Sequence, residues 1–211
     1  MSSTSSLTRR ALVAAALAAP TSAFAQRRRV VTLLGDSITA GYGLPASAAL
    51  PARLQAELDR LGANALVRGA GVSGDTTAGG LARVDFSVQK DTDVCVVALG
   101  GNDLLQGIEP ARTRANLDGI AARLKARGVG LVIAGLQPPS IVGRSYAAEF
   151  QAIFPTVARA HRAVLYPDLL AGVARQPALN QRDGFHPNAQ GVAVIARGLA
   201  PVVAKALASR R

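Results

Sequence analysis

Tryptophan is absent from this sequence, and aromatic residues make up only 4% of its 211 residues. Aromatic rings are the usual stacking platforms for nucleic-acid bases, and sugar rings stack on them too, so their scarcity argues against a protein that binds single-stranded nucleic acid or carbohydrate. Cysteine occurs once, as Cys95, which excludes a disulfide within the monomer. Cys95 lies in the apolar stretch 94–99, which predicts a small buried side chain rather than a nucleophile.

Charged residues are also few, at 18%, against 49% hydrophobic residues. This balance is typical of a globular chain, and the length fits one domain with a full-sized core. The first 25 residues are set apart, because Arg9 and Arg10 precede an apolar run at 11–19 and a small-residue site, Ala-Phe-Ala, at 23–25. This layout predicts a bacterial signal peptide over 1–25 and a single domain over 26–211.

The predicted signal peptide implies a periplasmic or secreted protein. Its apolar run is about half of the roughly 20 residues that span a bilayer, so no stable membrane insertion is expected after cleavage. The pair Arg9-Arg10 also fits a twin-arginine signal, and the sequence does not separate this export route from the general secretory one.

Basic residues outnumber acidic ones. The net charge of +11 falls to +9 (22 basic and 13 acidic residues) once Arg9 and Arg10 leave with the signal peptide. A basic surface attracts anionic lipid or nucleic acid, so a module that binds membrane surfaces is one alternative. The arginines are scattered at exposed helical positions without interleaved aromatic residues, which favours a solvated basic surface and no nucleic-acid partner.

Short apolar runs alternate with amphipathic stretches, a pattern typical of parallel α/β sheets. Five strands are predicted, at 30–34, 65–67, 93–99, 130–136 and 163–165. Helices are predicted at 47–61, 110–127, 147–161 and 188–208, with Pro201 expected to kink or break the last one. Ligands of such open sheets bind at the carboxyl ends of the strands, and the most specific motifs of this chain follow those ends.

Ser37 lies in the turn after the first strand, where a helix start can present backbone N–H groups to developing negative charge. Taken alone, it would be an ordinary N-cap serine. A nucleophilic serine needs a base, and the chain has only two histidines. His161 lies at a helix end with no acid positioned beside it, which favours a surface or helix-terminus role. His186 follows Asp183 by three residues, so one tight loop can bring a carboxylate to the imidazole while the other ring nitrogen faces the serine.

An acyl-transfer site also needs hydrogen-bond donors for the oxyanion. Asn102 follows the third strand after two glycines, which let its amide point inward. Gly74 follows the second strand and can offer an unobstructed backbone N–H. Glycine and asparagine are common turn residues, but their coincidence at successive strand ends with Ser37 and His186 favours a catalytic site.

Four segments together resemble the sequence blocks of the SGNH/GDSL hydrolases. They are Gly-Asp-Ser-Ile-Thr-Ala-Gly-Tyr-Gly at 35–43, Ser-Gly-Asp-Thr at 73–76, Gly-Gly-Asn-Asp at 100–103 and Asp-Gly-Phe-His-Pro at 183–187. The resemblance covers about residues 30–205. Within the four segments, the residues are similar to those of the arylesterase, acyl-CoA thioesterase and lysophospholipase subgroup. The first block has Ile38 where the family name has leucine, a residue of similar volume, so nothing catalytic is put in doubt.

The resemblance implies a flavodoxin-like, three-layer α/β/α fold with a five-stranded parallel sheet. It also implies a catalytic triad of Ser37, His186 and Asp183. The oxyanion hole would be formed by the N–H groups of Ser37 and Gly74 and the side chain of Asn102. The resemblance implies no metal and no cofactor.

The implied activity is hydrolysis of carboxylic esters and thioesters through an acyl-enzyme. Short- to medium-chain aryl esters and thioesters are the expected substrates, with lysophospholipids next. The loop 137–143 follows the fourth strand, and in the resembled subgroup this segment contributes to acyl binding, although a plain connecting loop is the alternative. Asp36, Pro138 and Ile141 are the candidate substrate contacts.

Two other functions are alternatives. Segment 69–74 spells Gly-x-Gly-x-x-Gly, with Asp91 and Asp93 about twenty residues later, as in a dinucleotide-binding oxidoreductase. Against it, the motif follows the second strand, and Asp93 begins a strand whereas a ribose-binding acid should end one. A carbohydrate O-acetylesterase on the same fold is disfavoured by the missing tryptophan and the few tyrosines.

Overall fold

The computed structural model describes residues 27–209, so the predicted signal peptide over 1–25 lies outside the described residues. Five parallel strands form one sheet in the order β2-β1-β3-β4-β5. Their bounds are β1 Arg29–Gly35, β2 Ala65–Gly71, β3 Val94–Ala98, β4 Gly130–Ala134 and β5 Val164–Tyr166. The predicted five-stranded parallel sheet is confirmed.

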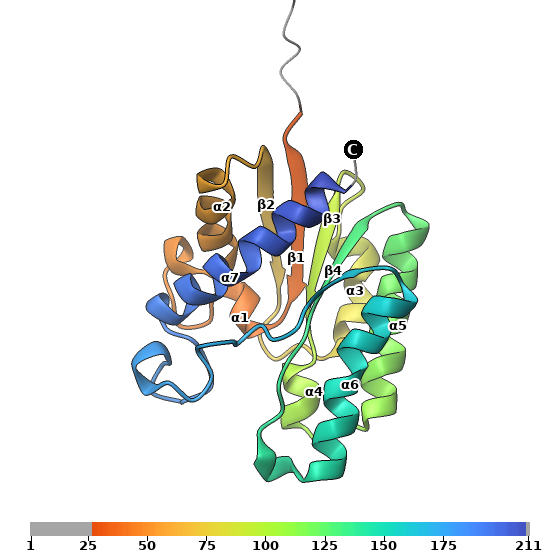
Figure 1. The fold of residues 1–211 in the computed structure, drawn as a ribbon, viewed down its shortest axis with the longest axis vertical. Helices are drawn as coiled ribbons and strands as arrows, with labels where there is room; N and C mark the ends of the chain where they lie inside the picture. Colours follow the sequence, from red (N-terminus) through yellow and green to blue (C-terminus); the bar gives the residue numbers. More distant parts are fainter. Residues whose placement is uncertain (1–26, 210–211) are drawn as a thin grey trace, which may run out of the picture.

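Helices cover both faces of this sheet (Figure 1). On one face lie α2 (Leu50–Arg60) and α7 (Ala189–Ala208), and on the other lie α3 (Thr77–Ser87), α5 (Pro110–Ala126) and α6 (Arg144–Ala160). The two shortest helices, α1 (Ser37–Ala40) and α4 (Gly101–Leu105), follow β1 and β3 directly. Three short 3-10 turns complete the described elements: Ala46–Ala48, Ser140–Val142 and Pro177–Leu179. The predicted three-layer α/β/α class is therefore confirmed.

The central strands are buried because helices pack on both of their faces, which is why they are continuously apolar rather than alternating. Val31, Leu33 and Leu34 of β1 have at most 1% of their surface exposed, and all of β3 is buried. Cys95 lies in β3, as expected for a small buried residue. Burial raises the pKa of its thiol to about 12, so it stays protonated and unreactive.

Helix α7 alone among the described helices is long and apolar enough to cross a membrane, judged by length and composition. Half of it is buried, and Val192, Ile195 and Leu199 recur at helical spacing on its inner face, which is typical of a core helix. The prediction at Pro201 was a kink or a break, and the helix continues through Pro201, so it does not break there. Pro201 and Arg197, whose carbonyl loses its N–H partner, are both exposed, and water can bond that carbonyl.

Strand β2 is seven residues long, so the predicted short strand at 65–67 is wrong in length. It pairs with β1 along its whole length. A Cβ atom at Gly69 would lie 2.8 Å from the ring of Pro51 in α2, and one at Gly71 would lie 2.3 Å from the backbone nitrogen of Ala40 in α1. The glycines of the Gly-x-Gly-x-x-Gly pattern therefore let two helices approach the sheet edge, and two of the three lie inside a strand instead of a phosphate-binding turn.

Other boundaries moved by a few residues. The predicted helix at 47–61 is a 3-10 turn followed by α2, because Pro51 stands in the first turn of the α-helix. Helix α6 begins three residues earlier than predicted, at Arg144, and α4 occupies a stretch expected to be a loop.

Candidate active site

Ser37 stands where β1 ends and α1 begins, at the carboxyl edge of the sheet. Asp36 caps α1, because its Oδ1 accepts the N–H of Ile38 at 3.0 Å. Ser37 is therefore the first helical residue and not the N-cap, and 9% of its surface is exposed. Its hydroxyl is free to bond a base rather than the helix backbone.

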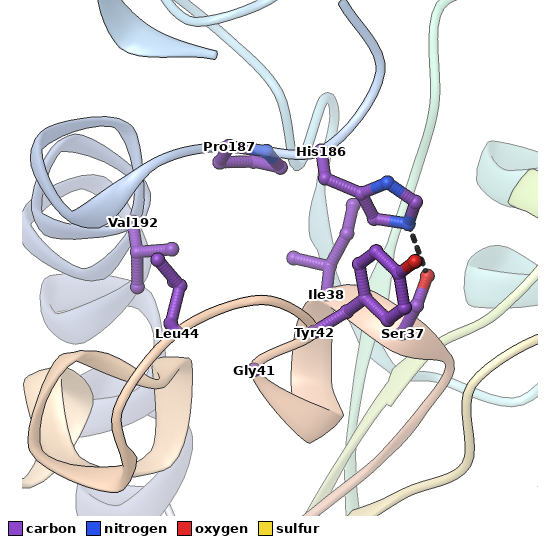
Figure 2. A pocket seen from close by; sticks show the side chains of 8 residues that line it. All are labelled: Ser37, Ile38, Gly41, Tyr42, Leu44, His186, Pro187 and Val192. Carbon is purple, nitrogen blue, oxygen red and sulfur yellow. Dashed lines mark hydrogen bonds between the residues drawn. The ribbon is translucent and has the colours of Figure 1, made fainter. Parts of the chain in front are cut away.

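His186 joins Ser37 to Asp183. The Nε2 of His186 lies 3.0 Å from the Oγ of Ser37, and the Nδ1 lies 2.7 Å from Oδ2 of Asp183 (Figure 2 shows the first contact). The N–H groups of His186 and Phe185 also donate to Oδ1 of Asp183, at 3.0 and 2.9 Å. These hydrogen bonds lower the pKa of Asp183 to about 2, so the carboxylate stays ionised beside the imidazole.

Donor groups face the same edge of the sheet. Within residues 27–209, the backbone N–H groups of Ser37 and Gly74 donate no hydrogen bond. Gly74 has φ of +81°, a left-handed conformation that favours glycine. Asn102, in the first turn of α4, donates one amide hydrogen to the carbonyl of Asp75 at 2.8 Å. Its second amide hydrogen has no partner within the same described stretch of chain.

The family of this chain follows from its match to a known family model. Residues 33–194 match the model of the GDSL-like Lipase/Acylhydrolase family. The chain belongs to this family. The predicted family and, with it, the enzyme class of ester hydrolases are confirmed.

Individual relatives agree with this assignment. The chain is 37% identical to Esterase TesA of Pseudomonas aeruginosa over 75% of this chain and 80% of the relative. It is also 37% identical to Thioesterase 1/protease 1/lysophospholipase L1 of Escherichia coli strain K12, over 80% of each chain. Among solved structures it is similar to AlinE4, an SGNH-hydrolase family esterase, with a TM-score of 0.72 and 43% identity over 86% of this chain and 97% of that one.

In this GDSL-like hydrolase, Tyr42 is a site residue whose role was not predicted from the sequence. Its ring centroid lies 4.6 Å from that of His186, with the planes tilted by 36° (Figure 2). Gln181 binds the same region, donating to the carbonyls of Tyr42 at 2.8 Å and Pro187 at 3.0 Å. Tyr42 lies inside the first sequence block, which was the available indication, whereas nothing near Gln181 in the sequence points to its contacts.

The three candidate substrate contacts have different surroundings. Asp36 is 6% exposed, and burial raises the pKa of its carboxyl to about 6. Pro138 is half-buried, and Ile141 is 90% exposed. A small hollow beside the nucleophile contains neither of these two loop residues; its lining is Ser37, Ile38, Gly41, Tyr42, Leu44, His186, Pro187 and Val192.

His161 has an acid beside it, so the expectation of none is wrong. Its Nε2 lies 3.1 Å from Oδ1 of Asp118 in α5. No local pattern predicts this pair, because the two residues are 43 positions apart. His161 does end α6, as expected, and the histidine that bonds the hydroxyl of Ser37 is His186.

The acidic side chains of the described part of the chain bear on metal and nucleotide binding. No group of three His, Cys, Asp or Glu side chains there is arranged to hold a metal ion. Asp91 and Asp93, the acids of the dinucleotide alternative, pair with Arg68 and with Arg27 and Arg29.

Proposed function

We propose that this protein is a serine esterase that cleaves carboxylic esters and thioesters through an acyl-enzyme formed on Ser37. The observation that carries the proposal is the continuous series of hydrogen bonds from Asp183 through His186 to the Ser37 hydroxyl. An ionised carboxylate at Nδ1 holds the imidazole in the tautomer that leaves Nε2 free to accept the serine proton.

In the first half of the reaction, the Oγ of Ser37 attacks the ester carbonyl carbon as its proton moves to Nε2 of His186. The carbonyl oxygen becomes an oxyanion, which the N–H groups of Ser37 and Gly74 and the free amide hydrogen of Asn102 can stabilise. The bond to the leaving group then breaks, and the departing alkoxide or thiolate takes the proton from His186. Ser37 is left acylated.

In the second half, water replaces the alcohol or thiol. His186 takes a proton from the water as its oxygen attacks the acyl carbon, and the same donors stabilise the second oxyanion. The ester bond to Ser37 breaks, and the proton on His186 returns to Oγ. Asp183 stays ionised throughout and stabilises the imidazolium in both halves.

The proposed substrates are aryl esters and thioesters with short to medium acyl chains, followed by lysophospholipids. The names of the relatives, an esterase and a thioesterase/lysophospholipase, support this range. Rates on p-nitrophenyl esters and acyl-CoA thioesters with acyl chains of two to sixteen carbons are expected to peak at short or medium length. A peak at the longest chains would contradict the range while leaving the mechanism intact.

Replacing the nucleophile tests the mechanism. Ser37→Ala is expected to lower kcat on p-nitrophenyl acetate by roughly a million-fold, because the oxygen that forms the acyl bond is gone. The control is Ser47→Ala, a hydroxyl of the 3-10 turn that precedes α2. Wild-type turnover in Ser37→Ala would refute the proposal.

We also propose export to the periplasm or the medium, with cleavage after residue 25. The layout of the first 25 residues supports this: Arg9 and Arg10 precede an apolar run at 11–19 and the small-residue site at 23–25. Cell fractionation combined with N-terminal sequencing is expected to find the mature chain beginning at Gln26 outside the cytoplasm. Retention of the whole chain in the cytoplasm would contradict export.

A further inference from the structure

Arg83, in the middle of α3, directs its guanidinium to the carboxyl edge of the sheet. Its side chain is only 19% exposed, and it pairs with Asp75, whose side chain is 11% exposed. Nε of Arg83 donates to Oδ2 of Asp75 at 2.7 Å. Burying the charge of an arginine is costly unless its hydrogen bonds are satisfied. The burial of Arg83 at the edge of the sheet that carries Ser37 therefore indicates a specific role.

Two further bonds of Arg83 go to the backbone of two strands. Nη2 donates to the carbonyl of Gly35 at the end of β1, and Nη1 donates to the carbonyl of Ala70 near the end of β2, both at 2.9 Å. Gly35 is two residues before Ser37, and Ala70 is four before Gly74. The planar guanidinium thus connects the two strand ends from which the two backbone oxyanion donors emerge.

Asp75 extends this connection to the third donor. Its carbonyl accepts one amide hydrogen of Asn102 at 2.8 Å. This bond fixes the rotation of the amide and leaves the second amide hydrogen available to the oxyanion. Its carboxylate is held by Arg83 and lies over Gly79, where a Cβ atom would be 1.8 Å from Oδ1. One residue therefore joins Arg83 to Asn102 and directly follows Gly74.

We propose that Arg83 is a positioning residue for the oxyanion hole, which holds the Gly74–Asp75 turn and, through Asp75, the Asn102 amide in register with Ser37. Arg83 touches neither substrate nor reacting atoms in this arrangement. Its contribution is to the transition state, because the oxyanion forms only there and donors displaced by a fraction of an ångström stabilise it less. The inference rests on the proposed esterase mechanism.

The test separates kcat from KM on p-nitrophenyl butyrate. Arg83→Met, which keeps the apolar stem but none of the donors, is expected to lower kcat by about 10- to 100-fold with KM changed less than about threefold. Arg83→Lys keeps the charge near Asp75 but cannot span both carbonyls, so its kcat is expected to fall by about three- to tenfold. The Lys variant carries the test if circular dichroism shows that Arg83→Met does not fold.

Arg127 provides a matched control at the opposite edge of the sheet. Its side chain is 24% exposed, and it too bonds two backbone carbonyls, those of Val88 and Gln89. Arg127→Met is expected to lower the melting temperature while leaving kcat within about twofold of wild type. A loss of kcat in Arg127→Met equal to that in Arg83→Met would overturn the inference, because general destabilisation would explain both.

A double-mutant cycle with Asn102 adds a readout that destabilisation does not produce. Because Arg83 acts in part through the Asn102 amide, the loss of kcat in the double variant Arg83→Met/Asn102→Ala should be smaller than the product of the losses in the two single variants. Fully multiplicative effects would overturn the connection through Asp75 to Asn102, and wild-type kcat in both Arg83 variants would overturn the positioning role as a whole. Failure of the esterase proposal is distinguishable, since it requires activity in Ser37→Ala, whereas an inactive Ser37→Ala with unimpaired Arg83 variants refutes this inference alone.

Discussion

Asp36 places a buried carboxyl directly beside the nucleophile. One oxygen caps α1, and the other lies 3.2 Å from where a Cβ atom of Gly101 would be. Burial raises the pKa of Asp36 from 3.8 to about 6, against the opposing effect of its hydrogen bond from Ile38. Because the folded protein holds this proton more tightly than the unfolded chain does, the contribution of Asp36 to stability is full below pH 4 and is lost as the pH rises through 6.

Asp36→Asn is expected to remove this dependence while keeping the cap, since the asparagine oxygen can accept the same N–H. Relative to wild type, the variant should gain about 2–3 kcal/mol in free energy of unfolding between pH 4 and pH 8. Urea unfolding at both pH values measures the difference. Asp36→Ala is the control, because it removes the cap as well as the charge, and an unchanged difference between Asp36→Asn and wild type across this range would contradict the burial argument.

Tyr42 offers the second residue-scale prediction. Its ring lies against the ring of His186, where it can stabilise the imidazolium that forms in the transition state. Tyr42→Ala is expected to lower kcat by about two- to fivefold, the equivalent of a half-exposed cation–π contact, and Tyr42→Phe to retain most of it. Steady-state kinetics on a p-nitrophenyl ester measure both; equal losses in the two variants would point instead to the phenol hydroxyl.

At the scale of elements, two irregular loops rather than helices or strands hold the triad together. The loop 181–187 carries Asp183 and His186, and Gln181 closes it by donating its backbone N–H to the carbonyl of His186 at 2.7 Å. The side chain of Gln181 reaches the carbonyl of Tyr42, in the loop that follows α1. One glutamine thus links the loop of the base to the loop that follows the helix of the nucleophile.

Gln181→Ala should loosen this link without touching the reacting groups. We expect kcat to fall by about tenfold, because the distance between His186 and Ser37 is no longer held. Gln190→Ala, an exposed glutamine in the first turn of α7, is the matched control and should leave kcat unchanged. Measuring kcat alongside the melting temperature checks this, and a Gln181→Ala enzyme with full turnover would show that the two loops hold their places independently.

What the sequence predicted at this scale follows from periodicity and strand ends. Buried strands are continuous apolar runs, so the sheet and its catalytic edge could be placed, and the Asp183–His186 pair lies within one short loop. The length of β2 was missed because its glycines suggested a turn, while their reason is the approach of Pro51 and α1. The His161–Asp118 and Arg83–Gly35 contacts were out of reach, because each joins residues about 40 or more positions apart with no local pattern.

At the scale of the whole molecule, the predicted mature chain carries a net charge of +9. Several of its arginines are neutralised locally, as in the Arg68–Asp91 and Arg83–Asp75 pairs. The remaining excess of positive charge acts over distances comparable with the Debye length, which is about 10 Å at 0.1 M salt. It therefore affects the encounter with a charged substrate more than the chemistry at Ser37.

The two proposed substrate classes differ in charge, which turns this excess into a measurable effect. Acyl-CoA thioesters carry phosphate groups, whereas p-nitrophenyl esters are neutral. Between 20 mM and 500 mM salt, kcat/KM for a short acyl-CoA is expected to fall by about three- to tenfold, because screening removes the attraction that speeds association. The value for p-nitrophenyl butyrate should change by less than about twofold over the same range, and kcat for both should stay constant. Equal salt dependence for the two substrates would mean that the positive charge lies where it does not act on the approach to Ser37.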